Sequence, residues 1–596
     1  MGSTFASRFP APAMIASLPR RSDRKASGRI RRGGFGNPAT RIGGPKYSML
    51  KGGSGKNVSH GILGERPQGC DPVRRGRDLP ALPIILLLLG ALATWLARRQ
   101  HERVWWAIAA VAAVITWGVC LGLVPAIPAA TRLSVWRPVD LFASRLELLL
   151  DPIGWRFIYG TSTLLVTVLL TAVARPGEAT PLGRAMMLGY AALGMMAMLA
   201  GNLLSVATAW ALMDLVMFVF LLGLVGKAPE ARGLVTRLAV DGGGVLLVVG
   251  AAVADWAAGG GRLASARPTS PLAIGLLALA VLLRLGLLPP HFSLPPLPRV
   301  RRGLGTLLRI VPPAAALCTL GRVLEPGIPP QIEPWLRLAG ALGALVGGVR
   351  WAAARDALEG RRYLVLGLAG LGILGGSLAS AEPGQAIAAA GSLLFLVGAV
   401  ASLNEVHTPT HRVWPVAGAL MLAGLAWTPG GMIAQTLATG ALRDGAWLSA
   451  AAGLGGMVTL SIGVLRGALA ESTPWPSGES LTRMVYGLGL ALPVLVAVGL
   501  GVRTPGSAGL PGAAAFGVAA GLGALVILAL RRAPARRLER WRRFLPLLDS
   551  EPFYEFLWRV FSSLMRGVRA VGEVLEGEGA LLWTYVIVIM VLLAVR

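Results

Sequence analysis

Apolar runs long enough to cross a bilayer recur along the chain from Pro80 almost to its C-terminus. The runs do not alternate between apolar and polar residues, which favours helices over the strands of a membrane barrel. Only 14% of the residues are charged and the mean hydropathy is +0.64, whereas a soluble chain carries about a quarter charged residues. The sequence therefore predicts an all-α, polytopic membrane protein of about 14–16 transmembrane helices. The expected runs are 80–97, 104–124, 153–174, 184–201, 203–226, 234–256, 271–290, 303–324, 334–352, 361–380, 384–403, 413–435, 446–466, 483–502, 512–530 and 579–595.

Basic residues are distributed unevenly between the two sets of loops that alternate between these runs. Most arginines fall in one set, which includes the loops at 98–103 and 350–362 and the segment 531–543. Because Lys and Arg are enriched in cytoplasmic loops, this set is predicted to be cytoplasmic. The net charge of +28 therefore reports topology, and no nucleic-acid partner is expected. We expect an integral, multi-pass protein of the bacterial inner (plasma) membrane, with the lipid bilayer as its surroundings.

The chain divides into four segments by composition. Residues 1–79 are basic and rich in Gly, Ser and Pro, and contain no apolar run; they are interpreted as a disordered tail, a targeting segment or a start placed upstream of the true one. Residues 80–530 hold most of the membrane runs. Residues 531–578 are amphipathic and are expected to form a helix on the cytoplasmic surface or a strut against a partner. Residues 579–596 form the expected final transmembrane helix.

The sequence offers little material for redox or metal chemistry. Its three cysteines are scattered without a paired spacing, so they support neither a disulfide framework nor an iron–sulfur site. His407 and His411 are four residues apart, but Pro409 between them argues against a helical metal site. No phosphate-binding glycine loop follows a strand. We therefore expect no cofactor, no metal and no catalytic site in this chain.

An arginine interrupts one apolar run, in the sequence VLLRLGLLPPHFSLP at 281–295. A charge at such depth costs several kcal/mol, so Arg284 requires a partner or a function. The following stretch, LPPHFSLPP at 288–296, resembles the signature of the antiporter-like membrane subunits of respiratory complex I, Mrp cation/proton antiporters and membrane-bound hydrogenases. That pattern runs Lys, several residues, then Pro-x-His-x-Trp-Leu-Pro-Asp. Here Pro289, His291, Leu294 and Pro295 match in register, while the lysine position is Arg284.

Four other stretches resemble parts of the same family in the same order. They are the fifth-helix motif at 202–210, the Gly-Leu-Pro-x-Thr-x-Gly motif at 424–435, a hairpin at 133–152 and the surface helix at 536–576. The family lysine of the second motif falls near Ala434 or Gln435, and a family histidine on the helix after the signature falls on Arg309. The resemblance covers roughly residues 80–596 and implies an antiporter-like transmembrane domain at 80–530 with discontinuous helices.

The resemblance implies an ion pathway whose titrating residues are changed. Members of the family relay protons through a glutamate and lysines, but arginine is not deprotonated in proteins. Lys227 is the last lysine in the chain. The glutamate position is Ala211, and Asp214 lies close to one helical turn beyond it. Asp214 is therefore interpreted in three ways: as a fixed partner of Arg284, as a proton- or ion-binding carboxylate, or as a residue in unrelated surroundings.

Other polar residues in the runs give weaker predictions. His291 titrates near neutrality and is interpreted as a proton-bearing group or as a cap on irregular backbone. Arg309 is expected to pair or to reach the interface, and Asp241 and Asp255 to lie at solvated interfaces near the ends of their run. The ion-pathway candidates are thus Asp214, Arg284, His291 and Arg309. Helix breaks are expected at Pro289, Pro290, Pro312 and Pro313, where donors are missing.

These features lead to one main functional expectation and one alternative. The chain is expected to be a membrane-arm subunit of a complex I-like or Mrp-like assembly, with other membrane subunits as partners. Its role there is proton or cation translocation or, given the lost lysines and glutamate, mainly structural. Any oxidoreductase activity, of the NADH–quinone type, would then belong to its partners. The alternative is a stand-alone secondary transporter of a cation or a small solute.

Overall fold

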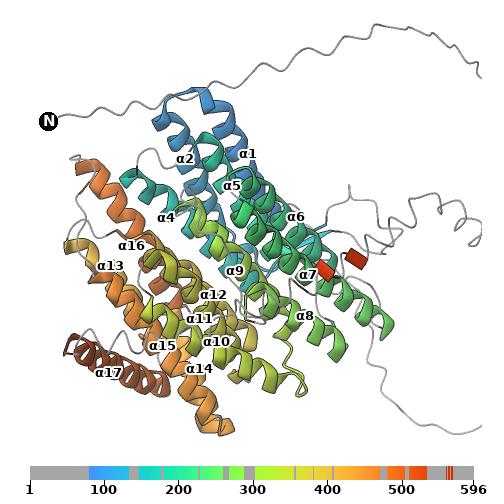
Figure 1. The fold of residues 1–596 in the computed structure, drawn as a ribbon, viewed down its shortest axis with the longest axis vertical. Coiled ribbons are helices and arrows are strands. Elements are labelled where there is room, and N and C mark those ends of the chain that lie inside the picture. The colour runs from blue at the N-terminus through green and yellow to red at the C-terminus, as the bar shows by residue number, and fades with distance from the viewer. Residues whose placement is uncertain are drawn as a thin grey trace, which may run out of the picture. The chain divides into compact units, whose positions relative to one another are not determined.

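The computed structural model describes most of the chain after the N-terminal segment (Figure 1). The described residues are 79–132, 146–175, 180–225, 228–259, 268–287, 302–354, 357–379, 382–405, 409–469, 475, 480–503, 509–532 and a few positions between 559 and 567. All of them belong to a unit that spans Cys70–Arg596. Residues 1–78 of the predicted N-terminal segment, the hairpin tip, the Pro289–Pro290 break, His291, most of the segment 531–578 and the final run lie outside the described residues.

Helices dominate the described part of the chain. They are α1 (Leu82–Leu96), α2 (Glu102–Gly122), α4 (Pro152–Thr171), α5 (Pro181–Leu199), α6 (Leu203–Leu222), α7 (Ala228–Ala257), α8 (Pro271–Arg284), α9 (Leu304–Leu324), α10 (Glu333–Ala353), α11 (Ala357–Leu378), α12 (Pro383–Leu403), α13 (Val413–Leu422), α14 (Pro429–Asp444), α15 (Trp447–Ala468), α16 (Ser480–Val502) and α17 (Leu510–Arg532). Ten helical spans among the described residues are long and apolar enough to cross a membrane. The predicted polytopic helical fold is confirmed, and the chain is an integral membrane protein.

Polar caps explain where several of these helices begin. The side chains of Asp151, Thr180, Asn202 and Thr428 accept hydrogen bonds from backbone N–H groups in the first turns of α4, α5, α6 and α14. A capped N-terminus matters in a membrane protein because the first N–H groups of a helix have no partner within it. Proline at the first helical position of α4, α5 and α14 fits the same pattern.

A short antiparallel hairpin precedes α4, and its first strand begins before the hairpin expected at 133–152. Strand β1 (Ala129–Arg132) pairs with β2 (Glu147–Leu150), with Ala129 opposite Leu150 and Arg132 opposite Glu147. Leu148 also forms a bridge to Ala200, just after the end of α5. The hairpin therefore joins the ends of two membrane helices.

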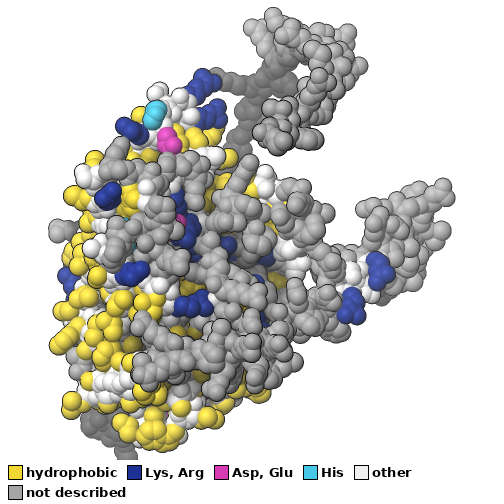
Figure 2. Space-filling view, turned by 60° about the vertical axis from the view of Figure 1, so that its left-hand side comes forward, with side chains coloured by type: hydrophobic (Ala, Val, Ile, Leu, Met, Phe, Trp, Pro, Cys, Tyr) yellow, Lys and Arg dark blue, Asp and Glu magenta, His cyan; other side chains and the backbone are white. Residues whose placement is uncertain are grey.

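Among the candidate membrane spans, α4, α9 and α12 are the most deeply buried. In α9 and α12, 94% of the most apolar stretch of 18 residues is buried within the protein. The corresponding share is 33% for the span that contains α1 and 28% for α2. In Figure 1, α9 lies between the α5–α8 group and the α10–α17 group. Figure 2 shows hydrophobic side chains over much of the surface at the left of that view, as expected for helices that face lipid.

Glycines bring α10 and α11 into backbone contact. A Cβ on Gly347 would lie 2.4 Å from the Gly367 nitrogen, and a Cβ on Gly370 would lie 2.4 Å from the Ala344 nitrogen. Such approaches exclude any larger residue unless the helices move apart. Small residues at helix interfaces are the usual basis of tight packing in membranes, where lipid removes most of the hydrophobic driving force.

The prediction of a helix break at Pro312 and Pro313 is wrong, because α9 continues through both residues. Each proline removes one N–H group, so the carbonyls of Leu308 and Arg309 lose their helical donors. Neighbouring helices enclose α9 almost completely and hold the chain helical on both sides of the prolines.

A break does occur in the run predicted as 413–435. It separates α13 from α14, where Gly424 has φ 98° and Trp427 has φ 55°. A Cβ on Gly430 would lie 1.7 Å from the carbonyl oxygen of Met421, so the two half-helices approach closely at the break. The discontinuous helices expected from the family resemblance are therefore present at this position.

Candidate functional site

The arginine in the apolar run forms a bidentate ion pair with Asp214. Nη1 of Arg284 donates to Oδ2 of Asp214 at 2.8 Å, and Nη2 donates to Oδ1 at 2.6 Å. Arg284 is the last residue of α8, and Asp214 lies in the middle of α6. The position suits a cation, because the carbonyl groups at a helix C-terminus carry partial negative charge.

The pair is enclosed by protein. The side chain of Arg284 is 0% exposed and that of Asp214 is 3% exposed. The guanidinium carbon of Arg284 lies 4.5 Å from the ring centroid of Trp210, one turn before Asp214 on α6. Stacking on the indole face gives the cation a second favourable contact. Because both carboxylate oxygens and two guanidinium nitrogens are used, the geometry is that of a closed pair.

A second buried pair lies close to the first. Nε of Arg237 donates to Oδ2 of Asp241 at 3.1 Å, one turn apart on α7. Both charges are near enough to interact electrostatically with Asp214. The hydroxyl of Tyr190 on α5 is within electrostatic range of all four groups and donates to the Met217 sulfur at 3.7 Å. Helices α5 to α8 thus enclose two acid–arginine pairs around one tyrosine.

Asp241 and Asp255 do not lie at solvated interfaces as the sequence suggested. Asp241 is 2% exposed and Asp255 is 3% exposed. Oδ1 of Asp255 accepts from the backbone N–H groups of Thr269 (2.7 Å) and Ser270 (3.1 Å), which immediately precede α8. The expectation failed because α6 and α8 both pack against α7 and because the residues just before α8 bind Asp255.

Arg309 occupies a different helix from the Asp214–Arg284 pair. It lies on α9, and its Nη1 donates to the Gly305 carbonyl at 3.0 Å. Its charge lies within electrostatic range of Arg237. Of the four ion-pathway candidates, the structure therefore brings Asp214 and Arg284 into contact and places Arg309 near the neighbouring pair, while His291 lies outside the described residues.

The half-helix α14 carries a neutral amide where the family resemblance places a lysine. Oε1 of Gln435 accepts from the Gly512 N–H at 2.6 Å, which links α14 to the start of α17. Next to it, Ala434 is fully buried. At the second lysine position of the family, the described residues therefore link two helices through a hydrogen bond and include no charged group.

Sequence reasoning missed a network at the opposite end of α9. Arg322 donates to both oxygens of Asp151 at 2.9 and 2.8 Å, and to the carbonyls of Ala200 and Leu149 at 3.0 and 2.9 Å. One guanidinium thus joins α9, the hairpin, the start of α4 and the end of α5. The Asp-Pro pair at 151–152 signals the helix start, but not its distant arginine.

Comparisons with solved structures identify the class of fold. It is the fold of the antiporter-like membrane subunits, as the sequence motifs predict. A chain of the membrane-bound sulfane sulfur reductase, an archaeal respiratory membrane complex, matches with TM-score 0.60 and 15% identity over 86% of this chain and 99% of that chain. A chain of the Mrp complex from Dietzia sp. matches with TM-score 0.65 and 17% identity over 87% of this chain and 62% of that one.

Respiratory complex I from Thermus thermophilus provides a third match. One of its chains aligns with TM-score 0.56 and 18% identity over 73% of this chain and 99% of that chain. No protein-family model and no curated protein matches the sequence. At these identities the comparisons establish the shared fold.

Proposed function

We propose that this chain is a membrane-arm subunit of a complex I-like or Mrp-like assembly in which the Asp214–Arg284 pair has a mainly structural role. The assembly, in a bacterial inner membrane, would include other antiporter-like or quinone-site membrane subunits. The fold and the printed descriptions of the matching complexes support this assignment. Redox chemistry would belong to other subunits.

The single observation that carries the proposal is the bidentate pair at the lysine position. A relay group must gain and lose a proton within a working cycle, and burial lowers the pKa of lysine readily enough for this. Arginine remains protonated. With both carboxylate oxygens of Asp214 bound to Arg284, the pair joins α6 to α8 and offers no exchangeable proton of its own.

Purification from native membranes tests the proposal. A C-terminally tagged protein, extracted in mild detergent, should recover other membrane subunits that mass spectrometry identifies as antiporter-like, quinone-site or iron–sulfur components. Recovery of the tagged chain alone would contradict it.

The alternative is a stand-alone secondary transporter of a cation or small solute. The neighbouring buried carboxylates Asp214 and Asp241 and the broken helix α13–α14 are the observations that favour it. Proton or cation flux through the purified protein in liposomes, abolished by Asp214→Asn, would support this alternative. Absence of flux through the wild-type protein would contradict the transporter alternative and favour the structural role.

A further inference from the structure

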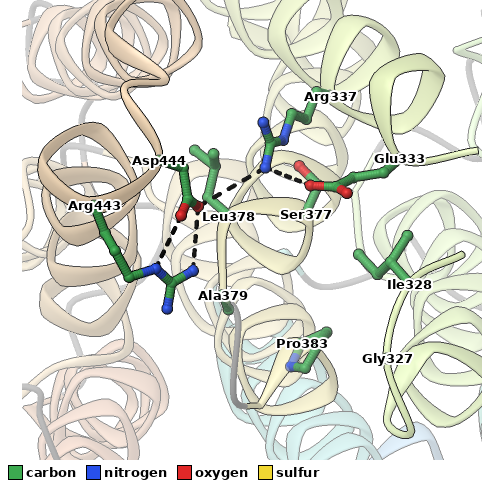
Figure 3. A pocket seen from close by; sticks show the side chains of 10 residues that line it. All are labelled: Gly327, Ile328, Glu333, Arg337, Ser377, Leu378, Ala379, Pro383, Arg443 and Asp444. Carbon is green, nitrogen blue, oxygen red and sulfur yellow. Dashed lines mark hydrogen bonds and ion pairs between the residues drawn. The ribbon is translucent and has the colours of Figure 1, made fainter. Parts of the chain in front are cut away.

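A hollow of about 360 Å³ lies at the end of the helices opposite to the arginine-rich loops. Figure 3 shows its lining, which comes from the turn after α9, the first turns of α10 and α12, the end of α11 and the end of α14. By the charge distribution of the loops, this is the non-cytoplasmic face. The hollow is separate from the buried pairs of α6 and α7.

Charged side chains of both signs line one side of the hollow. Nη2 of Arg337 contacts Glu333 on its own helix and lies 3.9 Å from Oδ2 of Asp444 on α14 (Figure 3). Arg443 donates to both oxygens of Asp444, at 2.9 and 3.1 Å. The four groups alternate in sign across α10 and α14, so a ligand that carries both charges can pair with groups of each sign.

The charged side chains are partly exposed, so a ligand can contact them. The side chains of Glu333, Arg337 and Asp444 remain 31%, 26% and 26% exposed. Arg337 contacts both carboxylates through a single nitrogen, Nη2. A phosphate beside Arg337 and Arg443 would accept from guanidinium N–H groups, and a primary ammonium would donate to the carboxylates of Glu333 and Asp444.

The surroundings of the hollow match the membrane–water interface. Trp335 on α10 and Trp447 at the start of α15 are 69% and 61% exposed, and exposed tryptophans mark the level of lipid headgroups. Leu442 and Leu448, which flank the lining residue Asp444 in the chain, are 66% and 87% exposed. They provide apolar surface on which an acyl chain can lie while the headgroup enters the hollow.

We propose that this hollow binds the headgroup of a zwitterionic phospholipid with a primary ammonium, the chemistry of phosphatidylethanolamine. The phosphate would face Arg337 and Arg443, and the ammonium would face Glu333 and Asp444. A quaternary ammonium fits less well, because it has no N–H group to donate to the carboxylates. A purely anionic headgroup has no ammonium group to pair with Glu333 and Asp444, and these carboxylates would repel it.

The test uses the full-length protein in nanodiscs of phosphatidylcholine alone or mixed with equal amounts of phosphatidylethanolamine or phosphatidylglycerol. The wild type should unfold at a higher temperature in the phosphatidylethanolamine mixture and retain that lipid in native mass spectrometry. Arg337→Gln should reduce the retained ratio of phosphatidylethanolamine to phosphatidylcholine roughly tenfold, as expected for the loss of a charge-assisted hydrogen bond.

Two further variants separate ligand binding from folding. Ile328→Trp enlarges an uncharged side chain of the lining and leaves all four charged groups in the sequence, and it should remove the lipid preference while leaving unfolding in pure phosphatidylcholine unchanged. Arg98→Gln is the matched control, because Arg98 also lies beside an exposed tryptophan, Trp95, but at the opposite membrane face. It should retain the full preference.

Three outcomes would overturn the proposal. Equal retention of phosphatidylethanolamine and phosphatidylcholine by the wild type would show that the hollow does not recognise the ammonium. Preferential retention of phosphatidylglycerol would indicate an anionic-lipid site. Stabilisation by soluble phosphoethanolamine in detergent, without lipid retention, would indicate a free zwitterion in place of a lipid.

Discussion

Asp214 and Arg284, seventy residues apart in the chain, meet through two hydrogen bonds of 2.8 and 2.6 Å inside the membrane domain. Their helices, α6 and α8, both pack against α7, which contributes the second acid–arginine pair. Removal of one partner leaves an uncompensated charge in a site enclosed by protein. Loss of both partners is far less damaging than loss of one.

Arg284→Leu should strongly reduce assembled protein, because it leaves the Asp214 carboxylate buried without a cation, at a cost of about 3–5 kcal/mol. Arg284→Lys keeps the positive charge and should be tolerated for assembly, with a smaller loss from the missing second hydrogen bond. The measurement is the yield of monodisperse protein after extraction. Equal yields of the two variants would contradict a stabilising role for the pair.

The double variant Asp214→Leu/Arg284→Leu should recover part of the yield that Arg284→Leu loses. The reason is that two well-packed apolar side chains remove the buried charge altogether. Thermal unfolding of the wild type, both single variants and the double variant gives the coupling free energy of the pair. A coupling energy near zero would mean that the contact does not contribute to stability.

Arg322→Lys should destabilise the protein despite the retained charge. A lysine ammonium cannot reproduce the bidentate contact with Asp151 together with bonds to the Ala200 and Leu149 carbonyls. We expect a loss of about 2–4 kcal/mol, since buried acceptors are left without donors. Arg132→Lys, at an exposed pair on the same hairpin, is the control and should change stability little.

Gly370→Ala should separate α10 from α11, because its Cβ would lie 2.4 Å from the Ala344 nitrogen. Overpacking of this kind costs about 1–3 kcal/mol. Gly487→Ala on α16 is a matched helical control, since its Cβ would meet no atom within 4 Å. Gly370→Ala should therefore unfold at a lower temperature than Gly487→Ala. Identical unfolding temperatures would contradict the backbone contact.

The ion pair at the end of α14 predicts a dependence on pH. The hydrogen bonds from Arg443 lower the pKa of Asp444, and the charges of Arg443 and Arg337 act in the same direction. A carboxyl group whose pKa falls on folding adds stability above its unfolded pKa of about 3.9, and that contribution disappears as the pH falls through the folded pKa. The difference in unfolding temperature between the wild type and Asp444→Asn should thus be largest near neutrality and shrink below pH 4. A difference that grows with acidification would contradict this assignment.

The sequence predicted the membrane class, most helix positions and the importance of Arg284, because a charge in an apolar run is visible without a structure. The partner Asp214 was one of three interpretations, based on its place one helical turn after Ala211, where the family resemblance puts a glutamate. Asp241 was misplaced because burial at the end of a run depends on neighbouring helices that the sequence does not reveal. Pro312 and Pro313 were misread for a related reason, since the packing around α9 overrides a local tendency to break the helix.

The closed pair of Asp214 and Arg284 has a consequence for the response of the protein to voltage. A membrane potential of 100 mV acts on each unpaired elementary charge with about 2.3 kcal/mol over the full membrane thickness. An aspartate and an arginine that move together carry no net charge, so the field does no net work on their displacement. If the pair remains closed whenever the protein changes conformation, the membrane potential exerts no net force on it.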